Sequence, residues 1–282
     1  MTAPAAAAAP RVPARRPFAA ARKYGAAFRL ALQSQIAYPA EMWLRTIFVG
    51  VIMFIFSSLW HTTYGELGRD RLGGLTLAGM LWYLAFTESI ILSRPRDAVR
   101  LDEEVRTGQL AYQLSRPYNF LLYRFAQVWG ERLPRFAVTL LVAAAMAVLF
   151  SGGVAVGPAG LLAGLPVLAL ALAIDFLFVI AISLFAFWAE DTTSFLFIYD
   201  RFLMILGGLL LPLDLFPGVL EPIARALPFA VVIYQPARMF VDPDGGRLVA
   251  VLAQQLVWLA VATLLAGGLF RYAVRRLQSN GG

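Results

Sequence analysis

The sequence contains no cysteine and a single histidine, His61. Without thiols the chain can form neither a disulfide framework nor a thiolate metal site. One imidazole leaves little room for histidine-based metal or proton chemistry. Charged residues are also scarce, at 15%, where an ordinary soluble domain carries roughly 25%. These shortages point away from a soluble metalloprotein and toward the 60% of residues that are hydrophobic.

The chain also lacks the motifs that carry nucleotide and covalent chemistry. No G-x-x-x-x-G-K-[ST] phosphate-binding loop is present, and the only lysine is Lys23. Neither a G-x-S-x-G nucleophile elbow nor an H-E-x-x-H metal helix occurs. We therefore expect no catalytic site, no bound cofactor and no metal in this chain, so any ATP-driven work would need a separate ATPase.

The hydrophobic residues gather in runs long enough to cross a bilayer, which takes about 20 residues in a helix. Six runs are recognised, at residues 42–62, 73–93, 134–153, 160–188, 193–213 and 248–270. The sequence therefore predicts an all-α polytopic membrane protein with six transmembrane helices. We expect residues 18–276 to form one membrane domain, flanked by a disordered basic tail at 1–17 and a short tail at 277–282. The tail at 1–17 lacks the apolar core that a cleaved signal peptide would contain.

Basic residues are distributed unevenly around these runs. Most of the 24 lysines and arginines fall before the first run, in the insert at 94–135, or after the last run. Because basic residues mark cytoplasmic loops, both termini and the insert are expected in the cytoplasm. This asymmetry also explains the net charge of +7 without a nucleic-acid partner.

The segment before the first run has the pattern of a basic amphipathic helix. Its apolar positions recur every fourth residue, at Tyr24, Phe28, Leu32 and Ile36. Arg22 and Arg29 lie on the opposite face, a pattern typical of helices in the membrane interface. Pro39 should end this helix. Two interpretations stay open, an interfacial elbow packed on the bundle and a plain lead-in helix.

The insert at 94–133 is too long for a simple turn, since most connections run about 4–6 residues. One face of a predicted short helix carries Leu101, Val105, Gly108 and Tyr112, and Leu110 and Leu114 form an adjacent ridge. Its first turn holds Asp102, Glu103 and Glu104, where the helix dipole favours negative charge. Arg116-Pro117 should end it. The insert is either a solvated loop on the membrane surface or a docking surface for a soluble partner.

Apart from Arg45 and Arg135 near the ends of their runs, the charged residues within the predicted spans are Glu88, Asp175, Asp200 and Arg201. A charge at bilayer depth costs about 2.5–3.5 kcal/mol on insertion scales and usually faces protein or water. Glu88 can be explained by its place near the interface, and Asp200 and Arg201 by a structural pair or a link to another span. Asp175 is deepest and has no basic neighbour in sequence. We expect Asp175→Asn to alter transport more than folding if Asp175 lines a polar path.

The segment at 212–246 is rich in proline. Five prolines, at 212, 217, 222, 228 and 236, forbid one uninterrupted helix. The segment could form a re-entrant or external helical hairpin at the outer end of the bundle, or an ordinary outer loop.

Two ordered patterns resemble the permeases of type-2 ABC exporters, the ABC-2 family. The insert matches the pattern E-x-R-x-G-x-L-x-x-x-L-x-R-P at Glu104, Arg106, Gly108, Leu110, Leu114, Arg116 and Pro117. The outer segment matches the family's P-L-x-x-F-P and L-P-F patterns at Pro212, Leu213, Phe216, Pro217, Leu227, Pro228 and Phe229. The resemblance extends over nearly the whole chain, with its basic lead-in helix and six runs.

This resemblance implies a permease subunit of an ATP-driven exporter in a bacterial plasma membrane. The insert, with Asp102 and Glu103, would be a coupling helix that sits in a groove of an ABC ATPase subunit. ATP and Mg would be bound by that partner. A complete exporter would contain two permease chains, identical or not, and two ATPases, with the cargo path between the permeases among membrane lipids. The family transports many kinds of cargo, so the resemblance names none.

Three rival functions remain from the residues alone. An ion- or proton-coupled secondary transporter would use the buried acids, although no internal repeat typical of such folds is recognised. A membrane enzyme acting on lipids would need a cluster of His, Asp or Lys at one interface, and the sequence shows none. A sensor or scaffold without transport is the third.

Overall fold

A computed structural model describes residues 17–37, 39–95, 101, 103–104, 107–116, 118–189 and 191–280. The longer helices are α1 (Pro17–Ala37), α2 (Pro39–Leu67), α3 (Leu77–Leu92), α6 (Phe120–Ser151), α7 (Pro158–Ser183), α8 (Thr193–Leu206) and α12 (Gly245–Asn280). The short elements are α5 (Gln109–Leu114), η1 (Leu184–Phe187), η2 (Leu213–Leu215), α9 (Leu220–Ala226), α10 (Pro228–Val232) and α11 (Tyr234–Val241). Within the described ranges the only β feature is the isolated bridge Leu72–Leu75, so the all-α prediction is confirmed.

Among the described residues, four helical segments are long and apolar enough to cross a membrane. They are Thr46–Leu67, Phe120–Ser151, Pro158–Phe187 and Gly245–Arg275. The second and fifth predicted spans are shorter than expected: α3 has 16 residues and α8 has 14. At 1.5 Å per residue these helices are about 24 and 21 Å long, below the roughly 30 Å of a bilayer core. The six-span count therefore stays a prediction.

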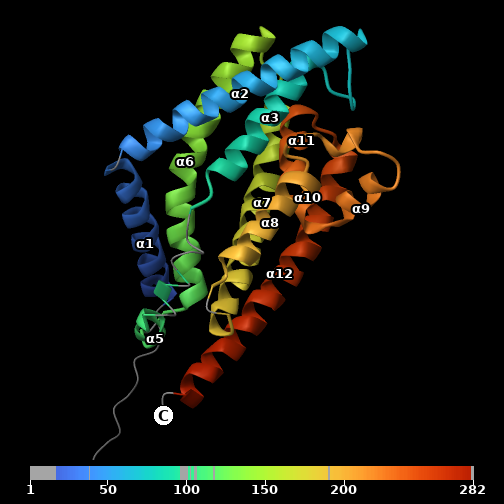
Figure 1. The fold of residues 1–282 in the computed structure, drawn as a ribbon. Coiled ribbons are helices and arrows are strands. Elements are labelled where there is room, and N and C mark those ends of the chain that lie inside the picture. Colours follow the sequence, from blue (N-terminus) through green and yellow to red (C-terminus); the bar gives the residue numbers. More distant parts are fainter. Residues whose placement is uncertain are drawn as a thin grey trace, which may run out of the picture.

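Helix α3 lies at the centre of the bundle. Every residue from Gly79 to Ile90 is buried, which is expected of a helix that is apolar on all sides. It packs against α2, α6 and α11, and α7 packs against α11 and α12 (Figure 1). Large apolar side chains remain exposed on the outer helices, including Ile47, Phe48, Val51, Phe54 and Ile55 on α2 and Phe195, Phe197, Ile198, Phe202 and Ile205 on α8. Such extended apolar surfaces are typical of lipid-facing or partner-facing helices.

Helix α6 is longer than the predicted third span. The end of the insert, from residue 120, and the third apolar run form one helix that begins at Phe120 and contains Pro134. Asn119 caps its start by accepting a hydrogen bond from the backbone N–H of Leu122 at 3.1 Å. The first half of α6 packs against α1, where a Cβ on Gly130 would lie 2.4 Å from the carbonyl oxygen of Phe28. The lead-in helix ends before Pro39 as predicted, and its place in the membrane interface stays a prediction.

The proline-rich segment is divided into η2, α9, α10 and α11, as its prolines predict. Pro228 is the first residue of α10, a position where its missing N–H has no cost. The segment ends in tight packing, because a Cβ on Gly160 of α7 would lie 2.1 Å from the carbonyl oxygen of Phe240. The Phe240 ring also stacks on Phe86 of α3, with centroids 4.1 Å apart. The end of this segment is thus part of the bundle core.

Several connections lie at the same end of the molecule. Figure 1 shows the start of α1, helix α5, the link between η1 and α8 and the C-terminal end of α12 at its lower end. The links between α2 and α3 and between α6 and α7 lie at the opposite end. The arrangement agrees with the expectation that the termini and the insert share one side.

Candidate functional site

A buried aspartate on α7 is the centre of a polar cluster within the bundle. Asp175 is 1% exposed. Its Oδ1 accepts hydrogen bonds from Nη2 of Arg94 at 2.8 Å and from the hydroxyl of Tyr199 at 3.0 Å. Its Oδ2 accepts from Nε of Arg94 at 3.0 Å and from Nη1 of Arg132 at 2.7 Å. The carboxylate therefore receives four hydrogen bonds from three side chains.

The two arginines extend this network to other elements. Arg132 of α6 also donates from Nη2 to the carbonyl oxygen of Ile90 at 3.0 Å, near the end of α3. Arg94, two residues after α3, pairs in addition with Asp200 of α8. Two arginines thus balance two aspartates, of which Asp175 is buried and Asp200 is 52% exposed. Pairing of this kind is the condition under which buried charges are tolerated. We call Arg94, Arg132, Asp175, Tyr199 and Asp200 the inner cluster; it links α3, α6, α7 and α8.

The sequence identified only part of the inner cluster. Asp175 and Asp200 were predicted as polar residues within the membrane, and the structure joins them through Arg94. Asp200 does not pair with its sequence neighbour Arg201, which is exposed and lies over the Phe197 ring at 4.5 Å. Glu88 is buried in α3 and takes no part in these hydrogen bonds. For the four predicted charges, Glu88, Asp175, Asp200 and Arg201, a role in a cargo path stays a prediction.

A hollow of about 460 Å³ lies beside the inner cluster. Arg94, Asp200 and Arg201 supply its charged lining, and the other lining residues are Ile91, Pro95, Val179, Thr193, Leu196, Phe197 and Met204. Apolar walls with a few polar groups are typical of ligand-binding pockets. Asp175 is not among the lining residues, because its own partners enclose it.

The insert contains a break that the predicted single helix did not include. Gly108 has a φ of +73°, in the left-handed region that favours glycine, and α5 begins directly after it. The backbone N–H of Thr107 bonds to the carbonyl oxygen of Glu103 at 2.9 Å and ends the preceding turn. The single-helix prediction for 101–116 is therefore wrong. Asp102, Arg106 and Pro117 lie outside the described residues.

The inner face of the insert is anchored on the bundle. Leu101 and Leu110 are buried in one apolar cluster with Phe120, Val128, Phe176, Ile180 and Leu184, and Leu114 packs against it. Glu104 forms an ion pair with Arg124 of α6. Leu101 and Tyr112 were predicted on one helical face, but Leu101 is buried and Tyr112 is 65% exposed. The break at Gly108 changes the orientation of α5 and brings Leu110 to the core instead.

The outer face of the insert is polar and open. Glu103, Gln109, Tyr112 and Arg116 are exposed, and the Arg116 guanidinium lies over the Tyr112 ring at 4.8 Å. A hollow of about 380 Å³ lies between this face and the first turns of α6. An anchored helix with an exposed aromatic–arginine pair has the composition of a protein-binding surface, where tyrosine and arginine are enriched.

A second charged cluster lies in the proline-rich segment. Asp214 accepts hydrogen bonds from Nη2 of Arg225 at 2.7 Å and from the hydroxyl of Tyr234 at 2.9 Å. Nε of Arg238 lies 3.8 Å from Asp214. Burial lowers the pKa of Arg225, but Tyr234, Glu221 and Asp214 outweigh burial and hold this pKa above its usual value. We call Asp214, Arg225, Tyr234 and Arg238 the outer cluster.

The hairpin residues named from the sequence surround the outer cluster without forming it. Pro212 is buried just before η2, and Phe216 and Pro217 lie in the link to α9. Pro228 begins α10. The charged residues Arg225 and Arg238 were missed as a site, since only their basic character is visible in the sequence.

A family model described as "ABC-2 family transporter protein" matches residues 46–281. The match extends over most of the chain, so this protein belongs to the ABC-2 transporter family, as the insert and proline patterns indicated. It is a membrane permease of the ABC transporter class. No curated protein and no solved structure gives a match.

Proposed function

We propose that this chain is the transmembrane subunit of an ATP-driven exporter and that a separate ABC ATPase binds the exposed face of its insert. The observation that supports this most strongly is the two-sided insert. One side is fixed to α6 and α7 by Leu101, Leu110 and the Glu104–Arg124 pair. The other side exposes Tyr112 and Arg116, and α5 lies at one end of the molecule (Figure 1). ATP and Mg would be held by the ATPase.

The contacts of the insert suggest how an ATPase movement reaches the bundle. A force on α5 acts on α6 and α7 through the apolar cluster around Phe120 and Phe176. The inner cluster then joins α6 and α7 to α8 and to the end of α3. Packed interfaces of this kind switch between discrete arrangements more readily than they deform gradually. The helices of the permease would thus move together, and this movement would change the side on which the cargo path is open.

We place six spans in the plasma membrane, with α3 and α8 as short spans and both termini in the cytoplasm. A second permease chain, identical or related, would cover part of the exposed apolar surface of the outer helices, and lipid would cover the rest. Cargo would pass along the interface of the two permeases, near the hollow lined by Arg94, Asp200 and Arg201.

An ion- or proton-coupled secondary transporter is the alternative. Its coupling would depend on buried acids that gain and lose charge. Asp175 and Asp200 are both paired with arginines, which leaves Glu88 as the acid outside such pairs in the described bundle. This arrangement gives the alternative less support than the anchored insert gives an ATPase-driven permease.

The docking proposal is tested by changing the exposed face of the insert and leaving its anchored face intact. The double variant Tyr112→Ala with Arg116→Glu should reduce co-purification of the co-expressed ATPase at least tenfold and abolish ATP-driven transport in proteoliposomes. Interface tyrosine and arginine residues are typical hot spots, with losses of about 2 kcal/mol or more. Thermal unfolding of the purified permease should be unchanged.

The matched control is Arg275→Glu, which reverses an exposed charge near the C-terminal end of α12. It should leave both ATPase association and transport intact. Normal association and normal transport in the Tyr112/Arg116 double variant would overturn the docking proposal.

A further inference from the structure

The hollow of about 460 Å³ beside the inner cluster has the size of a ligand-binding pocket, for which about 300–1,000 Å³ is typical. Helix α8 supplies most of its wall, and Val179 of α7 and residues at the end of α3 supply the rest. Every lining residue is at least partly exposed. The proposed function leaves the ligand of this hollow open.

Arg201 lines this hollow and has no acidic partner among the described residues. Its guanidinium lies over the Phe197 ring at 4.5 Å, and its Nη1 lies 3.2 Å from the sulfur of Met204. Phe197 and Met204 both line the hollow, so the charged group lies along the hollow wall. A ring face and a thioether are weak partners, whereas a charge at bilayer depth is usually paired. Arg201 can therefore take an anionic partner from outside the chain.

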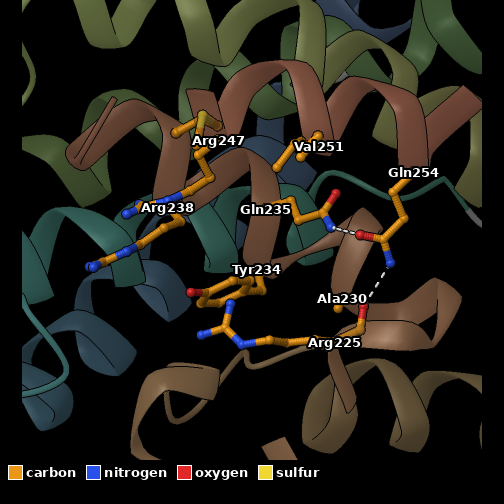
Figure 2. A pocket seen from close by; sticks show the side chains of 10 residues that line it. Arg225, Ala230, Tyr234, Gln235, Arg238, Arg247, Val251 and Gln254 are labelled. Atoms are coloured by element: carbon orange, nitrogen blue, oxygen red, sulfur yellow. Dashed lines mark hydrogen bonds between the residues drawn. The ribbon is translucent and has the colours of Figure 1, made fainter. Parts of the chain in front are cut away.

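The arginines around the smaller hollow at the outer cluster are a useful contrast. Figure 2 shows Arg225, Arg238 and Arg247 around that hollow of about 150 Å³. Arg225 pairs with Asp214 at 2.7 Å, and Asp242 pairs with Arg238 at 3.1 Å and with Arg247 at 3.2 Å. These three arginines are thus neutralised within the chain, unlike the arginine on α8.

The remaining charges near the larger hollow balance one another. Asp200 pairs with Arg94, and Asp175 pairs with both Arg94 and Arg132. These two arginines and two aspartates sum to zero, so the hollow has one positive charge in excess, that of Arg201. A ligand that neutralises this charge carries one anionic group.

The rest of the lining favours an apolar body on the same ligand. Apart from Thr193 and the charged residues, the hollow is lined by apolar side chains, namely Ile91, Pro95, Val179, Leu196, Phe197 and Met204. Apolar surface in such a wall is stabilised when a ligand removes it from water. The fitting ligand is therefore an amphiphile.

We propose that this hollow binds an amphiphile with one anionic group, either a small amphiphilic acid or an anionic membrane lipid. Its carboxylate or phosphate accepts from the Arg201 guanidinium, since arginine forms strong charge-assisted hydrogen bonds with both groups. Its apolar body lies against Leu196 and Phe197. The Asp200 side chain, 52% exposed, disfavours a second anionic group in the same hollow.

The site is tested on the full chain in nanodiscs of phosphatidylcholine, whose head group has no net charge. Binding of radiolabelled laurate is measured against empty nanodiscs, and dodecyltrimethylammonium, a cation of equal chain length, is the charge-reversed probe. Retention of phosphatidylglycerol is measured separately by native mass spectrometry.

Three variants change the site in different ways. Arg201→Gln removes the unpaired charge, and Thr193→Trp fills the hollow from an exposed position. Asp200→Asn removes the negative charge of the lining and leaves Asp175 with both of its arginines. The matched control is Arg29→Gln, an exposed arginine on α1 that is absent from the lining.

Arg201→Gln and Thr193→Trp should each weaken binding of the anionic probes at least tenfold, and Arg29→Gln should bind like the natural chain. Asp200→Asn should tighten anion binding roughly threefold, because a like charge beside the site is lost. Laurate binding shows that the hollow accepts small acids, and retention of phosphatidylglycerol alone assigns a membrane lipid.

The proposal would be overturned by absence of binding of both anionic probes, or by binding that survives Thr193→Trp. Unchanged anion binding in Arg201→Gln, or preferential binding of the cationic probe, would overturn it as well. The assay contains no ATPase, so its result is independent of the docking proposal.

Discussion

The inner and outer clusters are built from the same parts. Each has one aspartate that receives bonds from a tyrosine and has two arginines nearby: Asp175 with Arg94, Arg132 and Tyr199, and Asp214 with Arg225, Arg238 and Tyr234. In the inner cluster both arginines bond directly to the aspartate, at 2.7–3.0 Å. In the outer cluster Arg238 stays 3.8 Å away and keeps unused donors. We call the first cluster closed, because both arginines bond to its aspartate, and the second open, because only Arg225 does.

Their placement along the chain differs as well. The inner cluster joins residues from 94 to 200 and connects four structural elements. The outer cluster lies within residues 214–238, in one segment. Loss of the inner aspartate should therefore affect the whole bundle, and loss of the outer one should act locally.

The largest expected difference is between Asp175→Asn and Asp214→Asn. The first substitution leaves two arginines buried without a full counter-charge, at a cost of about 3–5 kcal/mol. The second should cost about 1–3 kcal/mol, because Arg225 keeps Glu221 and Arg238 keeps Asp242. Unfolding of the two variants in detergent, followed by circular dichroism, measures the difference.

Equal stability losses in these two variants would remove the distinction between a closed and an open cluster. From the residue pattern alone, Asp175→Asn was expected to alter transport more than folding. Because the Asp175 carboxylate accepts four hydrogen bonds, we now expect this substitution to have a large effect on folding as well.

An intermediate effect is expected when each tyrosine loses its hydroxyl. Tyr199→Phe removes one bond to Asp175 and keeps the ring packed near Phe178 and Phe229. A single hydrogen bond contributes about 0.5–1.5 kcal/mol, and about 1.5–3 kcal/mol when a charged group takes part. Tyr199→Phe should lie at the upper end of this range and Tyr234→Phe at the lower end, since the Asp175 side chain is 2% exposed and the Asp214 side chain is 20% exposed. A larger loss in Tyr234→Phe would reverse the comparison.

The smallest effect is expected at Arg201, the charged residue next to Asp200 that the inner cluster leaves out. Its guanidinium is exposed and contacts only the Phe197 ring and the sulfur of Met204 among the described residues. Arg201→Gln should change the free energy of unfolding by no more than about 0.5 kcal/mol, as for other surface substitutions. Arg94→Gln, measured in parallel, should cost several times more. Similar values for both would mean that the Arg94 bonds contribute little.

Hydrophobic runs and family patterns were sufficient to predict an all-helical membrane permease with a polar insert. They could not predict the inner cluster, because Arg94 and Arg132 lie 81 and 43 positions from Asp175. A carboxylate within an apolar run indicates that some partner exists. Which arginine reaches it depends on how α3, α6 and α7 pack, and periodicity carries no information on that packing.

The insert shows a second limit of sequence reasoning. Helical spacing predicted Tyr112 and Leu101 on one face. That prediction required the helix to continue without a break through Gly108. Gly108 has a left-handed φ, a backbone conformation that glycine can adopt but need not adopt. The prediction placed Leu101 on one face and Leu110 on an adjacent ridge, whereas the structure buries both in one apolar cluster and leaves Tyr112 exposed.

The proposed docking of an ATPase on the insert is tested most directly by site-specific cross-linking. The chain has no cysteine, so one introduced thiol reports a single position. Tyr112→Cys, labelled with a maleimide that carries a photoreactive second arm, should cross-link to the ATPase subunit on illumination of membranes that contain both proteins. Val219→Cys, 76% exposed in the proline-rich segment, should not. Cross-linking from Val219→Cys but not from Tyr112→Cys, or labelling of Tyr112→Cys by an impermeant reagent in intact cells, would contradict the proposed mechanism.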